Sequence, residues 1–182
     1  MEVLALTAGV AAARRHWRYR GQARPPFADT PAPGQRSVWD FPRPPAIEPV
    51  AQTLTVAAGD DVLARTDRGV RVLETAGAPT YYIPPDDVDA AGLVDLQQPT
   101  LCEWKGLARN FAWGEVAPAA WCYERTFPEF LAIRGWFAFH PGELRCLVGE
   151  ERVRPQPGGY YGGWVTSDLA GPIKGGPGSA GW

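Results

Sequence analysis

The last 28 residues (155–182) constrain the fold most, because they combine nine glycines and four prolines with four aromatic rings. Flexible linkers and disordered tails are rich in small polar and charged residues and poor in large rings. Glycine instead lets the backbone approach other surfaces closely, and rings gain stability when they are buried. We therefore predict an ordered, irregular strap (155–182) that packs on a folded body, with a flexible tail as the alternative. Its expected anchors are Tyr160, Tyr161, Trp164 and Trp182.

The composition is that of a soluble globular protein. The 182 residues are 45% hydrophobic, 12% aromatic and 21% charged, enough for one domain with a core and extensions. A formal net charge of −2 provides no general cationic field, so we expect no nucleic-acid partner. No apolar run reaches transmembrane length, so we expect no membrane partner either.

The N-terminal segment has a different composition from the rest of the chain. Residues 1–36 hold six arginines against two acidic residues, a balance of +4. Residues 3–18 favour a helix, and eight prolines between 21 and 49 exclude helix and predict an extended arm. We interpret residues 1–49 as a helix and arm that lie on an acidic body. A membrane or RNA contact is the alternative, through Arg14, Arg15, Arg18 and Arg20.

Residues 50–154 read as a β-rich domain. Segments 54–56, 62–66 and 70–74 alternate apolar and polar residues between glycine-containing turns, which predicts a three-stranded meander. Further strands are expected at 104–116, 119–124 and 136–139, with a hairpin over 144–153. Short helical turns are expected at 84–88 and 128–134. The predicted fold class is mainly β with a few short helices.

Three cysteines and two histidines limit the metal and redox chemistry. Cys102, Cys122 and Cys146 form no CxxC pair, and only His16 and His140 accompany them. We therefore expect no zinc site, no other cofactor and no disulfide framework, which favours a reducing cytoplasm.

Residues 100–106 hold the densest group of candidate site residues. On a strand, Thr100, Cys102 and Trp104 would share one face, while Glu103 and Lys105 share the other. A lysine desolvated beside aromatic rings can become nucleophilic, and a cysteine near a cation can become a thiolate. The alternatives are an ion pair of Lys105 with an acid such as Glu74, and Cys102 as a core residue.

The third expected strand supplies two further candidates, Arg71 and Glu74. Arg71 could hold a carboxylate or phosphate, and Glu74 could accept protons or orient Lys105. A structural ion pair at the edge of the sheet is the alternative. Four rings could form the walls of a ligand pocket or belong to the core: Tyr81, Tyr82, Trp121 and Tyr123.

Five segments in order resemble the DUF427 family, a bacterial and fungal domain of unknown function. They are residues 37–45, 72–75, 79–88, 100–106 and 155–166. The closing residues 171–182 resemble an actinobacterial subgroup. The resemblance implies a β-tent domain, similar to methionine-R-sulfoxide reductases and the thalidomide-binding domain of cereblon. Relatives that bind zinc use two CxxC pairs, which this chain lacks. The matching motif residues are Glu74, Tyr81, Tyr82, Cys102, Trp104 and Lys105.

These observations predict a cytoplasmic protein that binds a small polar or ring-shaped metabolite in an aromatic-lined pocket. One alternative is an enzyme that uses Lys105 and Glu74 in acid–base chemistry on a small metabolite. The other is a structural or interaction module, such as a homodimer formed through the arm or the strap. The strap shows no motif with an obvious catalytic group, so any chemistry is expected upstream of it.

Overall fold

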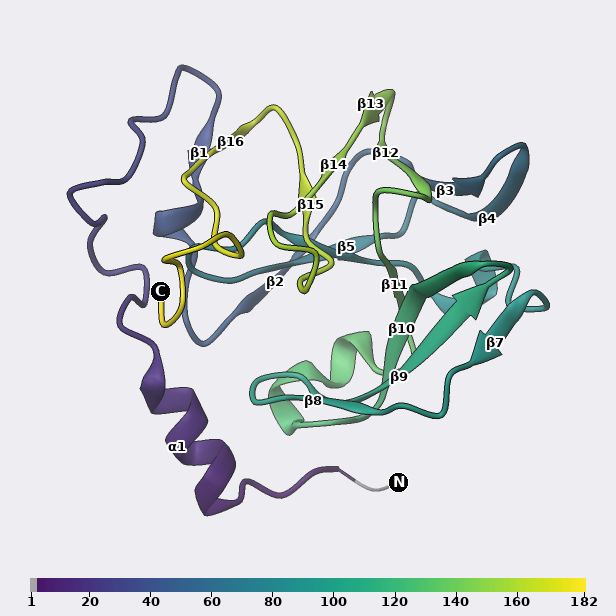
Figure 1. Cartoon of the computed structure of the whole chain (residues 1–182), viewed down its shortest axis with the longest axis horizontal. Coiled ribbons are helices and arrows are strands. Elements are labelled where there is room, and N and C mark those ends of the chain that lie inside the picture. The colour runs from purple at the N-terminus through teal and green to yellow at the C-terminus, as the bar shows by residue number, and fades with distance from the viewer. Residues whose placement is uncertain (1–2) are drawn as a thin grey trace.

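The computed structural model describes residues 3–182 and is mainly β, as predicted (Figure 1). Within residues 3–182, helical structure is confined to α1 (Ala8–His16) and the 3₁₀ turns η1 (Val38–Asp40), η2 (Pro85–Asp87) and η3 (Pro128–Ile133). The longer strands are β3 (Leu54–Ala58), β4 (Asp61–Thr66), β9 (Gly106–Trp113) and β10 (Val116–Thr126). The other strands are β1 (Arg36–Ser37), β2 (Ala46–Pro49), β5 (Val70–Leu73), β6 (Thr80–Tyr82), β7 (Leu93–Asp95), β8 (Thr100–Cys102), β11 (Phe137–Phe139), β12 (Arg145–Val148), β13 (Glu151–Arg152), β14 (Arg154–Pro155), β15 (Trp164–Val165) and β16 (Leu169–Ala170).

The largest sheet is built on the long antiparallel hairpin of β9 and β10. It runs in the order β11-β10-β9-β7, and β8 also pairs with β9. Trp121 and Tyr123 lie two residues apart on β10 and therefore point to the same face. Cys122 lies between them and faces a core cluster that includes Phe111 and Phe139. One face of this sheet is thus packed on a core, while the other presents aromatic rings.

The expected three-stranded meander is wrong: it is a hairpin followed by a strand of another sheet. β3 pairs with β4 in a sheet of order β13-β12-β3-β4, whereas β5 lies between β2 and β6. The free edge of β4 is occupied by a bridge from Ala64 to Val88. Leu54 also packs against Gly69, where an added Cβ would lie 2.3 Å from the leucine Cδ1. The chain therefore leaves the hairpin instead of turning back beside it.

Most of the other local predictions are confirmed, although the proline-rich arm, which was expected to exclude helix, contains the 3₁₀ turn η1. The hairpin over 144–153 is β12 and β13, and the turns at 84–88 and 128–134 are η2 and η3. The N-terminal helix is shorter than the predicted 3–18, because Thr7 caps it by accepting a hydrogen bond from the Val10 amide at 3.3 Å. It ends before Trp17, which has an extended backbone.

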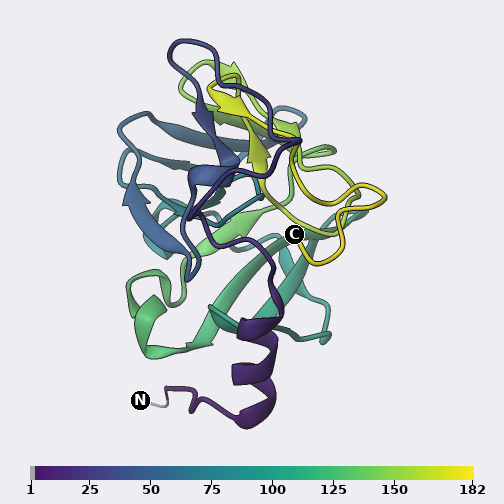
Figure 2. The same cartoon turned by 90° about the vertical axis from the view of Figure 1, so that its left-hand side faces the viewer.

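The arm and the strap pack on each other and on the body (Figure 2). β1 from the arm pairs in parallel with β16 from the strap. Trp182 stacks on Phe27 with ring centroids 5.1 Å apart and also contacts Trp39 at 5.2 Å. Trp164 is fully buried, so it is an anchor as expected. Tyr160 is not an anchor, because 80% of it is exposed.

The strap crosses itself at two glycines. At Gly158, φ is +84°, and an added Cβ would lie 1.9 Å from the carbonyl oxygen of Gly175. Such a close backbone approach at positive φ requires glycine. The crossing fixes the path of residues 159–175 over the body, which brings this part of the strap to the site described next.

Candidate functional site

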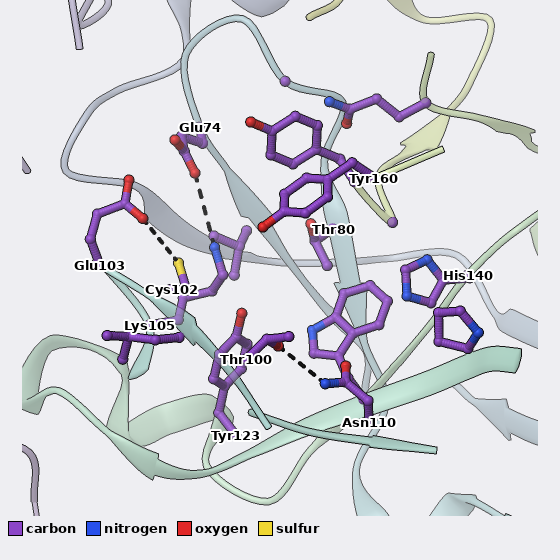
Figure 3. A pocket seen from close by; sticks show the side chains of 18 of the residues that line it. Glu74, Thr80, Thr100, Cys102, Glu103, Lys105, Asn110, Tyr123, His140 and Tyr160 are labelled. Carbon is purple, nitrogen blue, oxygen red and sulfur yellow. Dashed lines mark hydrogen bonds and ion pairs between the residues drawn. The ribbon is translucent and has the colours of Figure 1, made fainter. Parts of the chain in front are cut away.

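A cavity of about 780 Å³ lies between the aromatic face of the large sheet, strands β5 and β6, and the strap (Figure 3). Trp121 and Tyr123 from β10 form one wall. Trp17 from the arm and Tyr161 from the strap contribute further rings. The cavity is therefore assembled from segments at both ends of the chain and from its middle.

Glu74 is the electrostatic centre of this cavity. It follows β5 directly and keeps 18% of its side chain exposed. Its Oε1 accepts hydrogen bonds from Arg43 Nη2 at 3.0 Å and from Lys174 Nζ at 3.5 Å. Its Oε2 lies 3.9 Å from Lys105 Nζ, and Figure 3 shows these two side chains pointing toward one another. One carboxylate is thus shared by three cations.

Arg43 has a structural role, because all three of its guanidinium nitrogens bind groups within the protein. The Arg43 side chain has no exposed surface. Its guanidinium binds Glu74 and also donates to backbone oxygens of Tyr19, Trp182 and Thr75. Arg43 therefore joins the arm, β5 and the end of the strap. Lys105 and Lys174, by contrast, both line the cavity.

The charges shift the pKa values of all members of the cluster. Burial opposes ionisation of Glu74, but Lys174, Lys105 and Arg43 outweigh it and lower the pKa of the carboxyl below its ordinary value. Burial also opposes the Lys105 ammonium, yet the acidic groups of Cys102, Tyr82 and Glu74 raise its pKa. For Lys174 burial dominates, and with Arg43 and Lys105 nearby its pKa is lowered despite Glu74. The two lysines thus differ in how firmly they hold their protons.

Lys174 was missed by sequence reasoning, which expected no catalytic group in the strap. Its backbone N–H donates to the Ala76 carbonyl at 2.8 Å, and its own carbonyl accepts from Gln156 Nε2 at 3.0 Å. Its Nζ lies 4.4 Å from the centre of the Trp17 ring and 4.6 Å from that of Tyr161. One signal was present: Lys105 and Lys174 are the only lysines among the 18 basic residues.

The segment 100–106 contributes to the cavity through a turn. Cys102, Glu103 and Lys105 all line the cavity, and the Cys102 thiol lies 3.9 Å from Glu103 Oε2. The expectation that Cys102 and Lys105 lie on opposite faces of a strand is wrong, because β8 ends at Cys102 and residues 103–105 form a turn. Trp104 points away from the cavity and is buried beneath the Arg14 guanidinium.

Two aromatic residues of the predicted set have different roles. Trp121 lines the cavity and packs against His140, with ring centroids 4.5 Å apart. Burial lowers the pKa of His140 to about 4, so its ring is neutral at pH 7. Tyr82 is fully buried behind the cavity wall, 6.5 Å from the Tyr123 ring, and burial raises the pKa of its phenol.

Arg71 and Tyr81 are not brought to the cavity. Side chains alternate along a strand, and Val72 of β5 and Thr80 of β6 are the ones that line it. On the opposite face, Arg71 Nη2 lies 3.3 Å from Glu48 Oε2. Tyr81 stacks on Trp164 with centroids 4.9 Å apart. The structure thus gives Arg71 an ion pair within the sheet and Tyr81 a core contact.

Two further features bear on the class of protein. Within residues 3–182, no three His, Cys, Asp or Glu side chains are grouped as metal ligands, and the three cysteines are free. The same part of the chain contains no helix of the length and apolarity needed to cross a membrane.

Together, the fold and the site define a mainly β domain with one charged and aromatic cavity. Residues 46–150 match the family described as "Domain of unknown function (DUF427)", and since this is more than half of the chain, the protein belongs to that family. No curated protein matches the chain. The family segment supplies Glu74, Lys105 and Trp121, whereas Arg43 and Lys174 come from outside it.

Proposed function

We propose that this protein binds a small, ring-bearing metabolite that carries an anionic group. The observation that carries the proposal is the charge balance around Glu74. The Glu74 carboxylate is the shared counterion of Arg43, Lys105 and Lys174, whereas the Glu103 carboxylate accepts a hydrogen bond from Trp17. Buried charges are costly unless they are paired. A carboxylate or phosphate of a ligand would pair with Lys105, which lines the cavity.

The walls of the cavity favour a flat ligand. Trp121, Tyr123 and Tyr161 present rings to the same space, and such rings stack on planar groups. A volume of about 780 Å³ lies within the range of small-molecule sites, about 300–1,000 Å³. Asn110 adds an amide group that could orient a polar substituent. Cys102 at the wall adds a small polarisable surface.

A fragment screen by NMR tests this proposal. The library should contain ring-bearing carboxylates and phosphates, each with its uncharged counterpart, such as nicotinate and nicotinamide. We expect the anions to bind more tightly, to shift signals of Trp121, and to lose affinity in Lys105→Met. Arg65→Met is the matched control, because it removes an exposed positive charge that lies outside the cavity. Absence of binding by every charged fragment would contradict the proposal.

Other readings lead to different measurements. An acid–base enzyme would use Glu74 and Lys105, whose charged atoms lie 3.9 Å apart; turnover of a bound metabolite that Lys105→Met abolishes would support it. A homodimer through the arm or the strap stays a prediction, which light scattering tests.

The free cysteines support a reducing cytoplasm as the location. The actinobacterial subgroup also stays a prediction.

A further inference from the structure

Both lysines of this chain lie in the same cavity. The other 16 basic residues are arginines, yet Lys105 and Lys174, 69 positions apart, approach the same carboxylate. An arginine could supply the positive charge, but its guanidinium does not lose its proton in proteins. An amine can lose its proton and attack a carbonyl carbon. The site therefore holds the two side chains of the chain that are capable of amine chemistry.

Of the two, Lys174 has the surroundings of a reactive amine. Its side chain is 5% exposed and lies between the rings of Trp17 and Tyr161. Glu74 Oε1 lies 3.5 Å from its Nζ, in position to take a proton. Arg43 shares that same oxygen and competes for its negative charge. Desolvation and neighbouring cations are the two means by which proteins keep a lysine uncharged.

Lys105 has the surroundings of a fixed charge instead. It lies 3.9 Å from the other oxygen of Glu74, beside Cys102 and Tyr82. The Glu74 carboxylate favours its ammonium form. The two lysines thus have different roles. Lys105 holds an anionic group of the ligand, while Lys174 is free to react with a neighbouring carbonyl carbon of that ligand.

We propose that Lys174 forms a reversible imine with an aldehyde or ketone carbonyl of the bound ligand. This inference rests on the proposed function, since it requires that the cavity bind a small ring-bearing anion. The ligand class is then narrower: a carbonyl compound with a carboxylate or phosphate within reach of Lys105. Arg43 and Glu103 complete the charged groups around the reacting amine.

The chemistry balances without an oxidant or reductant. Glu74 takes a proton from the Lys174 ammonium, and the free amine attacks the carbonyl carbon. The nitrogen–carbon bond forms, and a proton moves from nitrogen to oxygen to give the carbinolamine. Glu74 then returns its proton to the hydroxyl, which leaves as water while the protonated imine forms. The imine keeps the single positive charge of the ammonium, so the carboxylate of Glu74 remains paired.

Reductive trapping on the full chain tests this proposal. The probe is pyridoxal 5′-phosphate, chosen as a flat, anionic aldehyde, and pyridoxine 5′-phosphate is the matched alcohol that cannot form an imine. After reduction with cyanoborohydride, peptide mass spectrometry locates the adduct. Interpretation is direct, because Lys105, Lys174 and the N-terminal amine are the only primary amines. The same reaction on denatured protein measures the intrinsic reactivity of each amine.

We expect one adduct on folded protein, located on Lys174 and lost in Lys174→Arg. The adduct should form at least tenfold faster than on denatured protein, and pyridoxine 5′-phosphate should compete. Mapping in the unmodified sequence makes the result independent of how the variants fold. An adduct on Lys105 or the N-terminus instead would overturn the assignment. Competitive binding of both probes without any adduct would overturn the imine alone, whereas failure of either probe and of all charged fragments to bind would overturn the proposed function.

Discussion

Replacing Glu74 by Gln removes the one negative charge that Arg43, Lys105 and Lys174 share. The shape of the side chain and its acceptor oxygen stay, so the change isolates the charge. The Arg43 side chain has no exposed surface, and it would lose the carboxylate that binds it. We expect the free energy of unfolding to fall strongly, although no packing is lost.

The magnitude follows from the burial of the cluster. Removing one partner of a buried ion pair costs about 3–5 kcal/mol. Because 18% of the Glu74 side chain is exposed, water in the cavity weakens the effect, and we expect the lower end, about 3 kcal/mol. For a chain of this size, 1 kcal/mol corresponds to about 2–4 °C in Tm, so Tm should fall by about 6–12 °C.

Urea denaturation followed by tryptophan fluorescence measures this loss. Glu103→Gln is the matched control, because that carboxylate also lines the cavity but is bound to Trp17 rather than to the cation cluster. The double variant Glu74→Gln/Lys174→Met should recover part of the loss, since it removes one of the unpaired cations.

The pH dependence gives an independent check. The pKa of Glu74 is lower in the folded protein than its ordinary value of 4.5. Its stabilisation is therefore complete above about pH 5 and disappears as pH falls below 4.5 through the folded pKa. The difference between the wild type and Glu74→Gln should shrink in that window. A difference below about 1 kcal/mol at pH 7, or one independent of pH, would refute the charge-sharing account.

Three further predictions follow. Lys105→Met should destabilise the protein by more than about 1 kcal/mol, whereas Lys174→Met should be neutral or stabilising, because folding favours the first ammonium and opposes the second; equal losses in urea denaturation would contradict this difference. The His140 imidazole should titrate by NMR with a midpoint of about 4, and a midpoint near 6.5 would show that burial does not act on it. Gly158→Ala should lower Tm far more than Gly159→Ala, since both have positive φ but only the first would clash with backbone; equal shifts would contradict the strap crossing.

Local sequence patterns were sufficient to predict most of the longer strands, the short helical turns and the family. The proximity of Glu74 and Lys105 was also anticipated as an ion pair, which the structure shows at 3.9 Å. These features depend on residues close in sequence, or on motifs that the family resemblance groups together. The meander failed because an edge of β4 is taken by Val88 from a later segment, which no local pattern reveals.

The errors at the site have two physical origins. The sequence prediction placed Arg71 in the same site as Glu74. Side chains alternate along β5, however, so Val72 and Glu74 face the cavity and Arg71 points to the opposite face of the strand. That error could have been avoided by counting positions. Lys174 could not be placed, because its position depends on a backbone crossing between residues 158 and 175. Only the rarity of lysine in this chain pointed to it.

NMR of protein labelled with ¹³C at lysine Cε tests the central claim most directly, because the chain contains only two lysines and gives two side-chain signals. A titration should show Lys174 losing its proton below the ordinary value of 10.5 and Lys105 above it, with Glu74, Arg43 and Tyr161 as the neighbouring titratable or charged groups. Addition of nicotinate should shift both signals. Two lysines that titrate together near 10.5, with signals unmoved by nicotinate, would contradict the account.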